Sequence, residues 1–305
     1  VFLNAGESED GTERAVEALE LVSQLEEQLS VYRHRSEVSL LNAAAAKRPV
    51  RVEPRLFDLL QQANELYAAT DGAFDITSGP LIRAWGFYGR QGRLPTDKAI
   101  SEALQRVGGQ WLQLGPEPNM VRFLKPDLEI NLGGIGKGYA LDSCAELLQQ
   151  SEISNFMIHG GHSSILTRGQ RVRGDSQGGW SVGLRHPLRP DRRLGQVCLR
   201  DQALATSGAG TQHFYAQGRR FGHIIDPRSG QPADHLISAT VLAGRAAEAD
   251  ALSTAFYVLG LEQATESCEN YPEIAALLTS AGPRAGTMTV HPVGLSEDQW
   301  QQLSD

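Results

Sequence analysis

A glycine-rich stretch, Asn131-Leu-Gly-Gly-Ile-Gly-Lys-Gly-Tyr-Ala-Leu-Asp142, lies near the middle of the chain. It leaves a predicted short strand at 128–132 and enters a predicted helix at 137–150. Its glycines let the backbone approach a ligand closely, and the N-terminus of a helix favours anions. The stretch matches neither the Walker A pattern nor G-x-G-x-x-G. Two interpretations stay open at this point: a contact with a phosphate or nucleotide, and a tight structural turn.

The apolar pattern changes before this stretch, at about residue 110, from a helical period to short strands. Predicted helices cover 10–30, 54–70, 96–107, 137–150 and 246–259. Predicted strands cover 110–115, 119–124, 128–132, 154–159, 163–167, 180–186, 195–200, 236–243, 274–279 and 286–291, and a short terminal helix follows. A long hairpin loop is expected at 168–179, which is rich in glycine and polar residues. Helices and strands in blocks favour an α+β fold with mixed, largely antiparallel sheets and packed helices. We expect one domain over 1–305, or two closely associated lobes, with a truncated strand at the start.

Composition excludes several classes of protein. The 305 residues are 41% hydrophobic and 21% charged, which is ordinary for a globular chain and argues against disorder and against a coiled coil. The net charge of −8 argues against a general nucleic-acid binder. No apolar run approaches the ~18 residues of a membrane helix, so we expect membrane association only through a segment absent from this chain. The three widely spaced cysteines make neither a disulfide framework nor a zinc cluster, and we expect them to be buried.

A predicted helix carries a set of oxygen ligands in Glu248-Ala-Asp-Ala-Leu-Ser-Thr254. Asp250 and Thr254 are four residues apart and share a helix face, and Ser253 lies beside them. A carboxylate with two hydroxyls is a hard-oxygen set that suits Mg²⁺. The alternative is a helix with a solvated polar face.

Two histidine motifs stand out. In His223-Ile-Ile-Asp-Pro-Arg-Ser-Gly230 a short apolar strand precedes turn residues, and His223 is either a base or a structural histidine. In His159-Gly-Gly-His162 the spacing invites a zinc interpretation. We do not favour it, because there is no cysteine nearby and no obvious third ligand.

Aromatic residues mark two further segments. Ala73-Phe74-Asp75-Ile-Thr77, followed by Trp85-Gly-Phe87, could hold a planar ring and its polar edges, or form a packed loop with a capping aspartate. Tyr32 closes the first predicted helix and either stacks on a ligand or packs in the core.

Taken together, the segments resemble the ApbE family of FAD:protein FMN transferases. The matching segments occur in family order over roughly residues 14 to 280: Ser30-Val-Tyr32 through Asn42, Asp71-Gly72-Ala73-Phe74-Asp75-Ile-Thr77 with Trp85-Gly86-Phe87, Asn131 to Asp142, Thr206-Ser207-Gly208, His223 to Gly230, and Ala249-Asp250-Ala-Leu-Ser253-Thr254.

The resemblance implies an ApbE-like, T-fold-like architecture and an enzyme that uses Mg²⁺ to cleave FAD between its phosphates. FMN would pass to a Thr or Ser hydroxyl of a target protein, and AMP would leave. His223 would be the base, and Mg²⁺ would be held by Asp250, Ser253, Thr254 and the carbonyl of Gly134. The remaining residues would contact the flavin nucleotide, together with His223: Tyr32, Ala73, Phe74, Asp75, Asn131, Lys137 and Ile225.

The sequence also departs from the family pattern. Asn131 stands where the family has aspartate, Gly136 where it usually has alanine, and the short Met-Gly-Thr element at the start of the fold is missing. An FAD pyrophosphatase, in which water replaces the target hydroxyl, and a non-catalytic FAD-binding protein are therefore alternatives. Retention of Asp250, Thr254 and His223 favours an enzyme. The resemblance implies a periplasmic or cell-envelope location, although the chain carries no targeting signal.

Overall fold

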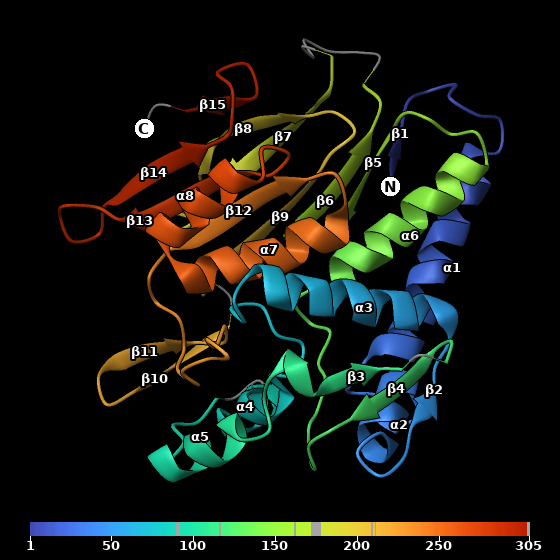
Figure 1. The fold of residues 1–305 in the computed structure, drawn as a ribbon. Helices are drawn as coiled ribbons and strands as arrows, with labels where there is room; N and C mark the ends of the chain where they lie inside the picture. Colours follow the sequence, from blue (N-terminus) through green and yellow to red (C-terminus); the bar gives the residue numbers. More distant parts are fainter. Residues whose placement is uncertain are drawn as a thin grey trace. The chain divides into compact units, whose positions relative to one another are not determined.

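The computed structural model describes residues 1–89, 92–115, 117–161, 163–171, 178–208, 210 and 212–303. The chain divides into two compact units (Figure 1). Unit 1 contains Val1–Ser23, Lys137–Gly208 and His235–Asp305, and unit 2 contains Gln24–Gly136 and Ala209–Asp234. Each unit is therefore assembled from segments that are distant in the sequence.

Unit 1 is built on a seven-stranded sheet in the order β1-β5-β6-β9-β12-β13-β14, in which all neighbouring strands are antiparallel. Its strands are β1 (Phe2–Leu3), β5 (Phe156–Gly160), β6 (Ser164–Arg168), β9 (Ala203–Gly208), β12 (Ser238–Ala243), β13 (Ala275–Ala281) and β14 (Met288–Val293). A second antiparallel sheet has the order β15-β8-β7, formed by β7 (Trp180–Arg185), β8 (Arg193–Leu199) and β15 (Trp300–Gln302).

The core of unit 1 joins these sheets to one another. Leu204, Leu242 and Leu277 of the large sheet pack with Val197 and Trp300 of the small one. The alternation of buried and exposed residues along β7 is what a strand with one buried face requires. Helix α7 (Ala246–Leu259) lies against β9 and β12, and α8 (Leu261–Asn270) lies against β13 (Figure 1).

Unit 2 combines helices with two small antiparallel sheets. Its helices are α2 (Glu37–Ala44), α3 (Pro54–Ala69), α4 (Gly79–Ala84), η1 (Phe87–Gly89), α5 (Asp97–Leu104) and η2 (Gly109–Trp111). Its strands are β2 (Val50–Arg51), β3 (Leu112–Leu114) and β4 (Met120–Phe123), with the hairpin of β10 (His213–Ala216) and β11 (Arg219–Gly222). Trp85, Phe87, Ile100 and Phe221 belong to one buried cluster, which ties the hairpin to α4 and α5.

In two helices the chain passes from one unit to the other: α1 (Gly11–Leu29) and α6 (Gly136–Gln150). Among the residues the structure describes, none of the helices has the length and apolarity needed to span a bilayer.

The predicted α+β fold with antiparallel sheets is confirmed, and each of the five predicted helices is present. Cys144 and Cys268 are buried as predicted, whereas Cys198 is only partly buried. Several elements were not predicted: α2, α4, α8, η1, η2, β2, β9, β10 and β11. The loop predicted at 168–179 falls partly outside the described residues.

Three local predictions are wrong. The strand expected at 128–132 does not form, because the amide of Asn42 accepts from the Ile130 N–H and donates to its carbonyl, and so satisfies both backbone groups. The terminal helix is instead β15, because Trp300 is buried when this segment pairs with β8. His223 follows the end of β11 rather than opening a strand, and Ile225 makes only an isolated bridge to Pro232.

Candidate functional site

In unit 1 the site is centred on the carboxylate of Asp250 on α7, which is only 4% exposed. Lys137 Nζ lies 3.0 and 3.2 Å from its two oxygens. The Gly138 N–H donates to Oδ2 at 3.2 Å, and the Ser164 hydroxyl donates to Oδ1 at 3.3 Å. A buried carboxylate needs such partners, and the start of α6 and strand β6 together provide them.

The start of α6 reaches Asp250 because α6 and α7 pack unusually closely. Gly138 has no side chain, and a Cβ placed there would lie 2.0 Å from the carbonyl oxygen of Ala246. One turn further along α6, Asp142 accepts from the first two amides of α7, Ala246 N at 2.8 Å and Ala247 N at 3.0 Å. Burial raises the pKa of Asp142, while these hydrogen bonds oppose the rise. The carboxylate therefore caps α7 and fixes the helix that carries Asp250.

Three hydroxyls lie on the next turn of α7 and on β9. Ser253 Oγ and Thr254 Oγ1 donate to the carbonyl of Asp250, at 2.9 and 3.2 Å. Ser207 Oγ of β9 is 2.9 Å from Ser253 Oγ and 3.2 Å from Thr254 Oγ1. Ser253 is fully buried, whereas Thr254 is partly exposed.

The oxygen atoms of Asp250 and of the hydroxyls near it are of the kind that bind a hard cation. The described residues contain no group of three or more His, Cys, Asp or Glu side chains arranged to hold a metal, so a softer or nitrogen-rich site is not present among them. One carboxylate with neighbouring hydroxyls fits Mg²⁺, which needs few protein ligands. In this structure the ammonium of Lys137 pairs with the carboxylate of Asp250 at 3.0 Å.

Unit 2 holds a second cluster, around Tyr88. Tyr32 is 61% exposed, and its ring meets that of Tyr88 edge-on at 5.8 Å between centroids. Asn131 Nδ2 donates to the Tyr88 hydroxyl at 3.2 Å, and that hydroxyl donates to Glu129 at 2.8 Å. Arg83 covers the Tyr88 ring at 4.8 Å and pairs with Glu129. Asn131 is thus oriented by an aromatic network, and its Oδ1 accepts from the Gly133 N–H.

The loop from Ala73 to Thr77 is buried. Asp75 Oδ1 accepts from both the N–H and the hydroxyl of Thr77, each at 2.7 Å, and that hydroxyl accepts from the Gly108 N–H. Burial raises the pKa of Asp75 to about 6, against the lowering effect of these hydrogen bonds. Ala73 and Phe74 are also buried. In this structure Asp75 shapes its own loop, and its direct contact with flavin stays a prediction.

His223 is oriented by the backbone of unit 2. Its Nδ1 lies 3.0 Å from the carbonyl oxygen of Gln212, which can only accept, so Nδ1 carries the proton. In the neutral ring Nε2 then carries the lone pair. The ring also meets Phe87 edge-on at 6.4 Å. These contacts hold a basic nitrogen in one orientation.

Comparison with known proteins decides the family. The sequence profile of the ApbE family matches residues 4–278. The chain belongs to the ApbE family. It is 34% identical to an FAD:protein FMN transferase of Salmonella typhimurium over 245 residues, 78% of this chain and 69% of the relative. The corresponding protein of Haemophilus influenzae is 30% identical over 88% of this chain and 79% of its own length.

Solved structures of the ApbE family have the same fold. The apo form of the Pseudomonas stutzeri flavinyl transferase ApbE superposes with a TM-score of 0.82 at 28% identity, covering 95% of this chain and 89% of that one. The ApbE protein of Thermotoga maritima gives a TM-score of 0.83 at 29% identity, covering 93% and 90%.

The structure brings some of the residues predicted from the ApbE resemblance together. Asp250, Ser253, Thr254 and Lys137 form one cluster in unit 1. Tyr32, Asn131, Ala73 to Asp75, His223 and Ile225 belong to unit 2, as does Gly134, whose carbonyl stays a predicted ligand. Of the zinc candidates, His159 bonds the Gly161 carbonyl through Nδ1, and His162 lies outside the described residues.

Sequence reasoning missed several polar residues of these clusters, among them Ser164, Ser207 and Tyr88. Ser207 was quoted within Thr206-Ser207-Gly208, and Tyr88 directly follows the Trp85-Gly86-Phe87 segment. The motifs that contain Ser207 or precede Tyr88 were therefore the sequence signal by which these two residues could have been predicted. Ser164 had none, because only the pairing of β6 brings it to α7.

Proposed function

We propose that this protein transfers FMN from FAD to a Thr or Ser hydroxyl of an acceptor protein and releases AMP. The observation that carries the proposal is the buried Asp250 carboxylate, held by Lys137, Gly138 and the Ser164 hydroxyl, in a chain of the ApbE family. The curated relatives bear the name FAD:protein FMN transferase. Cleaving a pyrophosphate requires concentrated charge and positioned donors, which this cluster offers.

Mg²⁺ would be held by Asp250 and Thr254, with Ser253 beside them and the Gly134 carbonyl as a further oxygen ligand. When bound, it supplies positive charge that neutralises the charge developing on the pyrophosphate. Lys137 has a half-exposed side chain, and its ammonium can serve both the Asp250 carboxylate and a phosphate oxygen. Ser207 and Ser253 support this proposal by fixing the turn of α7 that carries Thr254.

His223 supplies the base for the acceptor. Its Nε2 takes the proton of the acceptor hydroxyl as that oxygen forms a bond to the phosphorus of the FMN half of FAD. The bond from this phosphorus to the bridging oxygen breaks, and that oxygen leaves with AMP. The hydrogen bond from Nδ1 to Gln212 favours the tautomer that this step needs.

The flavin nucleotide lies, in this proposal, against Tyr32, Phe74 and Asn131. Tyr32 supports it because its ring is largely exposed and braced by Tyr88. The amide of Asn131 keeps an acceptor and a donor where the family has aspartate, but it carries no charge. We therefore assign Asn131 to orientation of the ligand and not to proton transfer.

The deciding experiment incubates the full chain with FAD, Mg²⁺ and a Thr-containing acceptor protein, and measures the acceptor by mass spectrometry and AMP by chromatography. We expect the mass of FMN on the acceptor, with AMP in equal amount. AMP and free FMN without modification would identify an FAD pyrophosphatase. Bound FAD without AMP would identify a binding protein, and both results would contradict the transferase.

We also propose a periplasmic or cell-envelope location, because the family resemblance implies it. Cell fractionation with an antibody to the native protein tests this, and detection in the cytoplasmic fraction alone would contradict it.

A further inference from the structure

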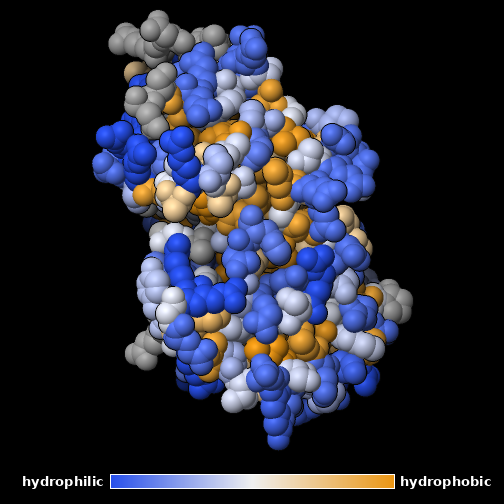
Figure 2. All heavy atoms as spheres, turned by 90° about the vertical axis from the view of Figure 1, so that its left-hand side faces the viewer, coloured by the Kyte–Doolittle hydropathy of each residue, from blue (hydrophilic) through white to orange (hydrophobic). Residues whose placement is uncertain are grey.

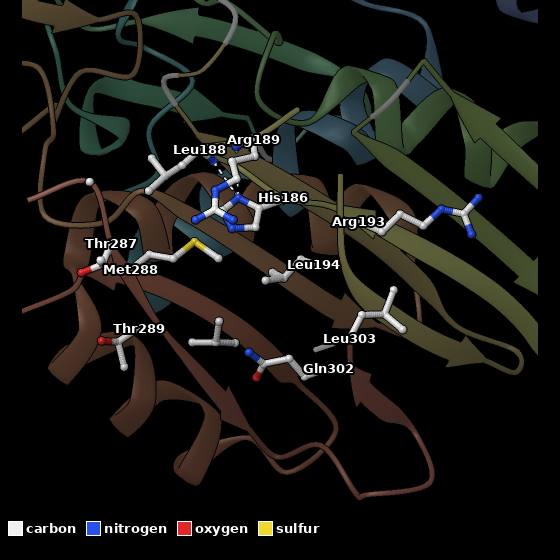
Figure 3. A pocket seen from close by; sticks show the side chains of 12 residues that line it. His186, Leu188, Arg189, Arg193, Leu194, Thr287, Met288, Thr289, Gln302 and Leu303 are labelled. Carbon is white, nitrogen blue, oxygen red and sulfur yellow. Dashed lines mark hydrogen bonds between the residues drawn. The ribbon is translucent and has the colours of Figure 1, made fainter. Parts of the chain in front are cut away.

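Unit 1 contains a pocket that none of the residues assigned above lines. It has a volume of about 570 Å³ and lies where the connection between β7 and β8, the start of β14 and the end of β15 meet (Figure 3). This volume is within the ~300–1,000 Å³ of pockets that hold small molecules. The lining is mixed: His186, Arg189 and Arg193 are its basic members, and Leu194, Met288 and Val290 are among its apolar ones.

His186 points a hydrogen-bond donor at this space. The residue is 7% exposed, and its Nδ1 accepts from the backbone N–H groups of Leu188 and Arg189, both at 3.1 Å. Because Nδ1 is used as an acceptor, the ring proton must be on Nε2. Figure 3 shows the Arg189 side chain directly beside this ring. A guanidinium offers five N–H donors in a fork that matches carboxylate and phosphate, so it can serve more than one acceptor.

The surrounding charge selects for anions. No aspartate or glutamate is among the described residues that line the pocket. The connection Arg185-His-Pro-Leu-Arg-Pro-Asp-Arg-Arg193 carries four arginines against one aspartate, in a chain whose net charge is −8. An anion entering here gains favourable Coulomb energy without meeting a like charge in the pocket wall.

The rest of the pocket is suited to an apolar body. Leu188 is 42% exposed and Leu303 is 48% exposed, and both line the pocket. Met288 and Val290 of β14 are partly buried against the core of unit 1. Figure 2 shows the face of the molecule that lies on the left of Figure 1, where β14 is drawn. On this face hydrophobic residues of unit 1 gather among hydrophilic ones. A ligand that covered this wall would remove apolar surface from water.

We propose that this pocket binds an amphiphilic organic anion. The His186 Nε2–H and the Arg189 guanidinium hold its carboxylate or phosphate, and its apolar part lies against Met288, Val290 and Leu303. The proposal is independent of flavin transfer, because no residue assigned to that reaction lines the pocket.

Isothermal titration of the full-length protein with decanoate tests the proposal, with decyl phosphate, decanol and inorganic phosphate as comparison probes. We expect saturable binding of one decanoate per chain, and binding of decyl phosphate at the same site in competition. Arg189→Gln should weaken both by roughly 10-fold or more, the usual effect of losing a hydrogen bond to a charged group. Met288→Glu, which places a like charge in the pocket, should abolish binding.

The matched control is Arg192→Gln, which removes a charge from the same connection at a residue that does not line the pocket. It should leave decanoate affinity within about twofold, because a solvent-exposed charge contributes little. Equal loss in both arginine variants would overturn the site, since only general charge attraction would then be at work. If decanol bound as tightly as decanoate, the anionic group would have no role in binding. If inorganic phosphate bound as tightly as decanoate, the apolar wall would have none. No saturable binding by any probe would overturn the pocket altogether.

Discussion

Asp250 is the residue on which the proposed chemistry depends most. It is the only charged oxygen ligand of the proposed metal set, so Asp250→Ala should reduce Mg²⁺-dependent AMP release by roughly 10²-fold or more. The fold should survive, because Lys137 is half exposed and can be hydrated when its partner is lost. Thr254→Ala should be milder, since it removes a neutral ligand.

The measurement is AMP release at several Mg²⁺ concentrations, with far-UV circular dichroism of each variant. Glu248→Gln, on the same helix, is the control for a lost carboxylate and should retain activity. Equal rates for Asp250→Ala and the parent protein at low Mg²⁺ would remove Asp250 from the metal site.

His223 carries the distinction between binding and transfer. An asparagine at this position can still donate to the Gln212 carbonyl but cannot accept a proton at neutral pH. His223→Asn should therefore keep FAD affinity within a few fold and slow FMN transfer by about 10²–10⁴, the usual contribution of general-base catalysis. His213→Asn, an exposed histidine in the same unit, is the matched control. Transfer at the parental rate would move the base elsewhere, and loss of FAD binding would make His223 a ligand contact.

Asp75 makes stability depend on pH. Its pKa is raised by burial from 3.8 to about 6, so the folded protein keeps a proton that the unfolded chain has already released. The free energy of unfolding should therefore fall as pH rises from about 4 to about 6 and then level off. Asp75→Asn removes this contribution, and its stability relative to the parent should increase by about 3 kcal/mol over that range. Chemical denaturation of both proteins between pH 4 and pH 7 measures it; a difference that does not change with pH would show that folding does not shift the pKa of Asp75.

At the scale of elements, the contact between α6 and α7 should tolerate no extra atom. A Cβ at Gly138 would lie 2.0 Å from the Ala246 carbonyl oxygen, so Gly138→Ala should separate the helices and lower the melting temperature by several degrees. A Cβ at Gly136, on the same helix, would lie 3.8 Å from its nearest neighbour. Gly136→Ala should therefore be neutral or stabilising by up to ~1 kcal/mol, from helix propensity. Thermal denaturation compares the two, and an equal response would mean that α6 and α7 are less tightly packed than described.

At the scale of the whole molecule, the chain leaves unit 1 after β9, contributes the β10–β11 hairpin to unit 2, and returns at β12. Phe221 of this hairpin is nearly buried and lies 5.5 Å from the Trp85 ring. Phe221→Ala should destabilise unit 2 by about 3–5 kcal/mol. Hydrogen exchange should therefore rise in peptides from α4, α5 and the hairpin.

Exchange in β12 and β13 should not change, because these strands belong to unit 1. Tyr215→Ala, an exposed aromatic on the same hairpin, serves as the control and should leave exchange unaltered. Faster exchange throughout β12 and β13 would mean that the two units do not open separately.

From the sequence alone we could predict the fold class, the long helices and the spacing of the oxygen-bearing residues on α7. These features are local: helical periodicity predicts α3, and the four-residue spacing of Asp250 and Thr254 puts them on one helix face before any tertiary contact is known. The order of six motifs along the chain likewise determined the family.

The groups that surround those residues are brought there by tertiary contacts and could not be predicted from the sequence. Ser164 reaches Asp250 through the pairing of β6, and Asp142 caps a helix that begins 104 residues later. Strand β9 contains Thr-Ser-Gly, a weak strand sequence, and is ordered by its neighbours β6 and β12. Segment 128–132 reads as a strand but bonds a side-chain amide instead. Such outcomes depend on groups distant in sequence, because a buried polar atom is satisfied by whichever partner the fold brings within reach.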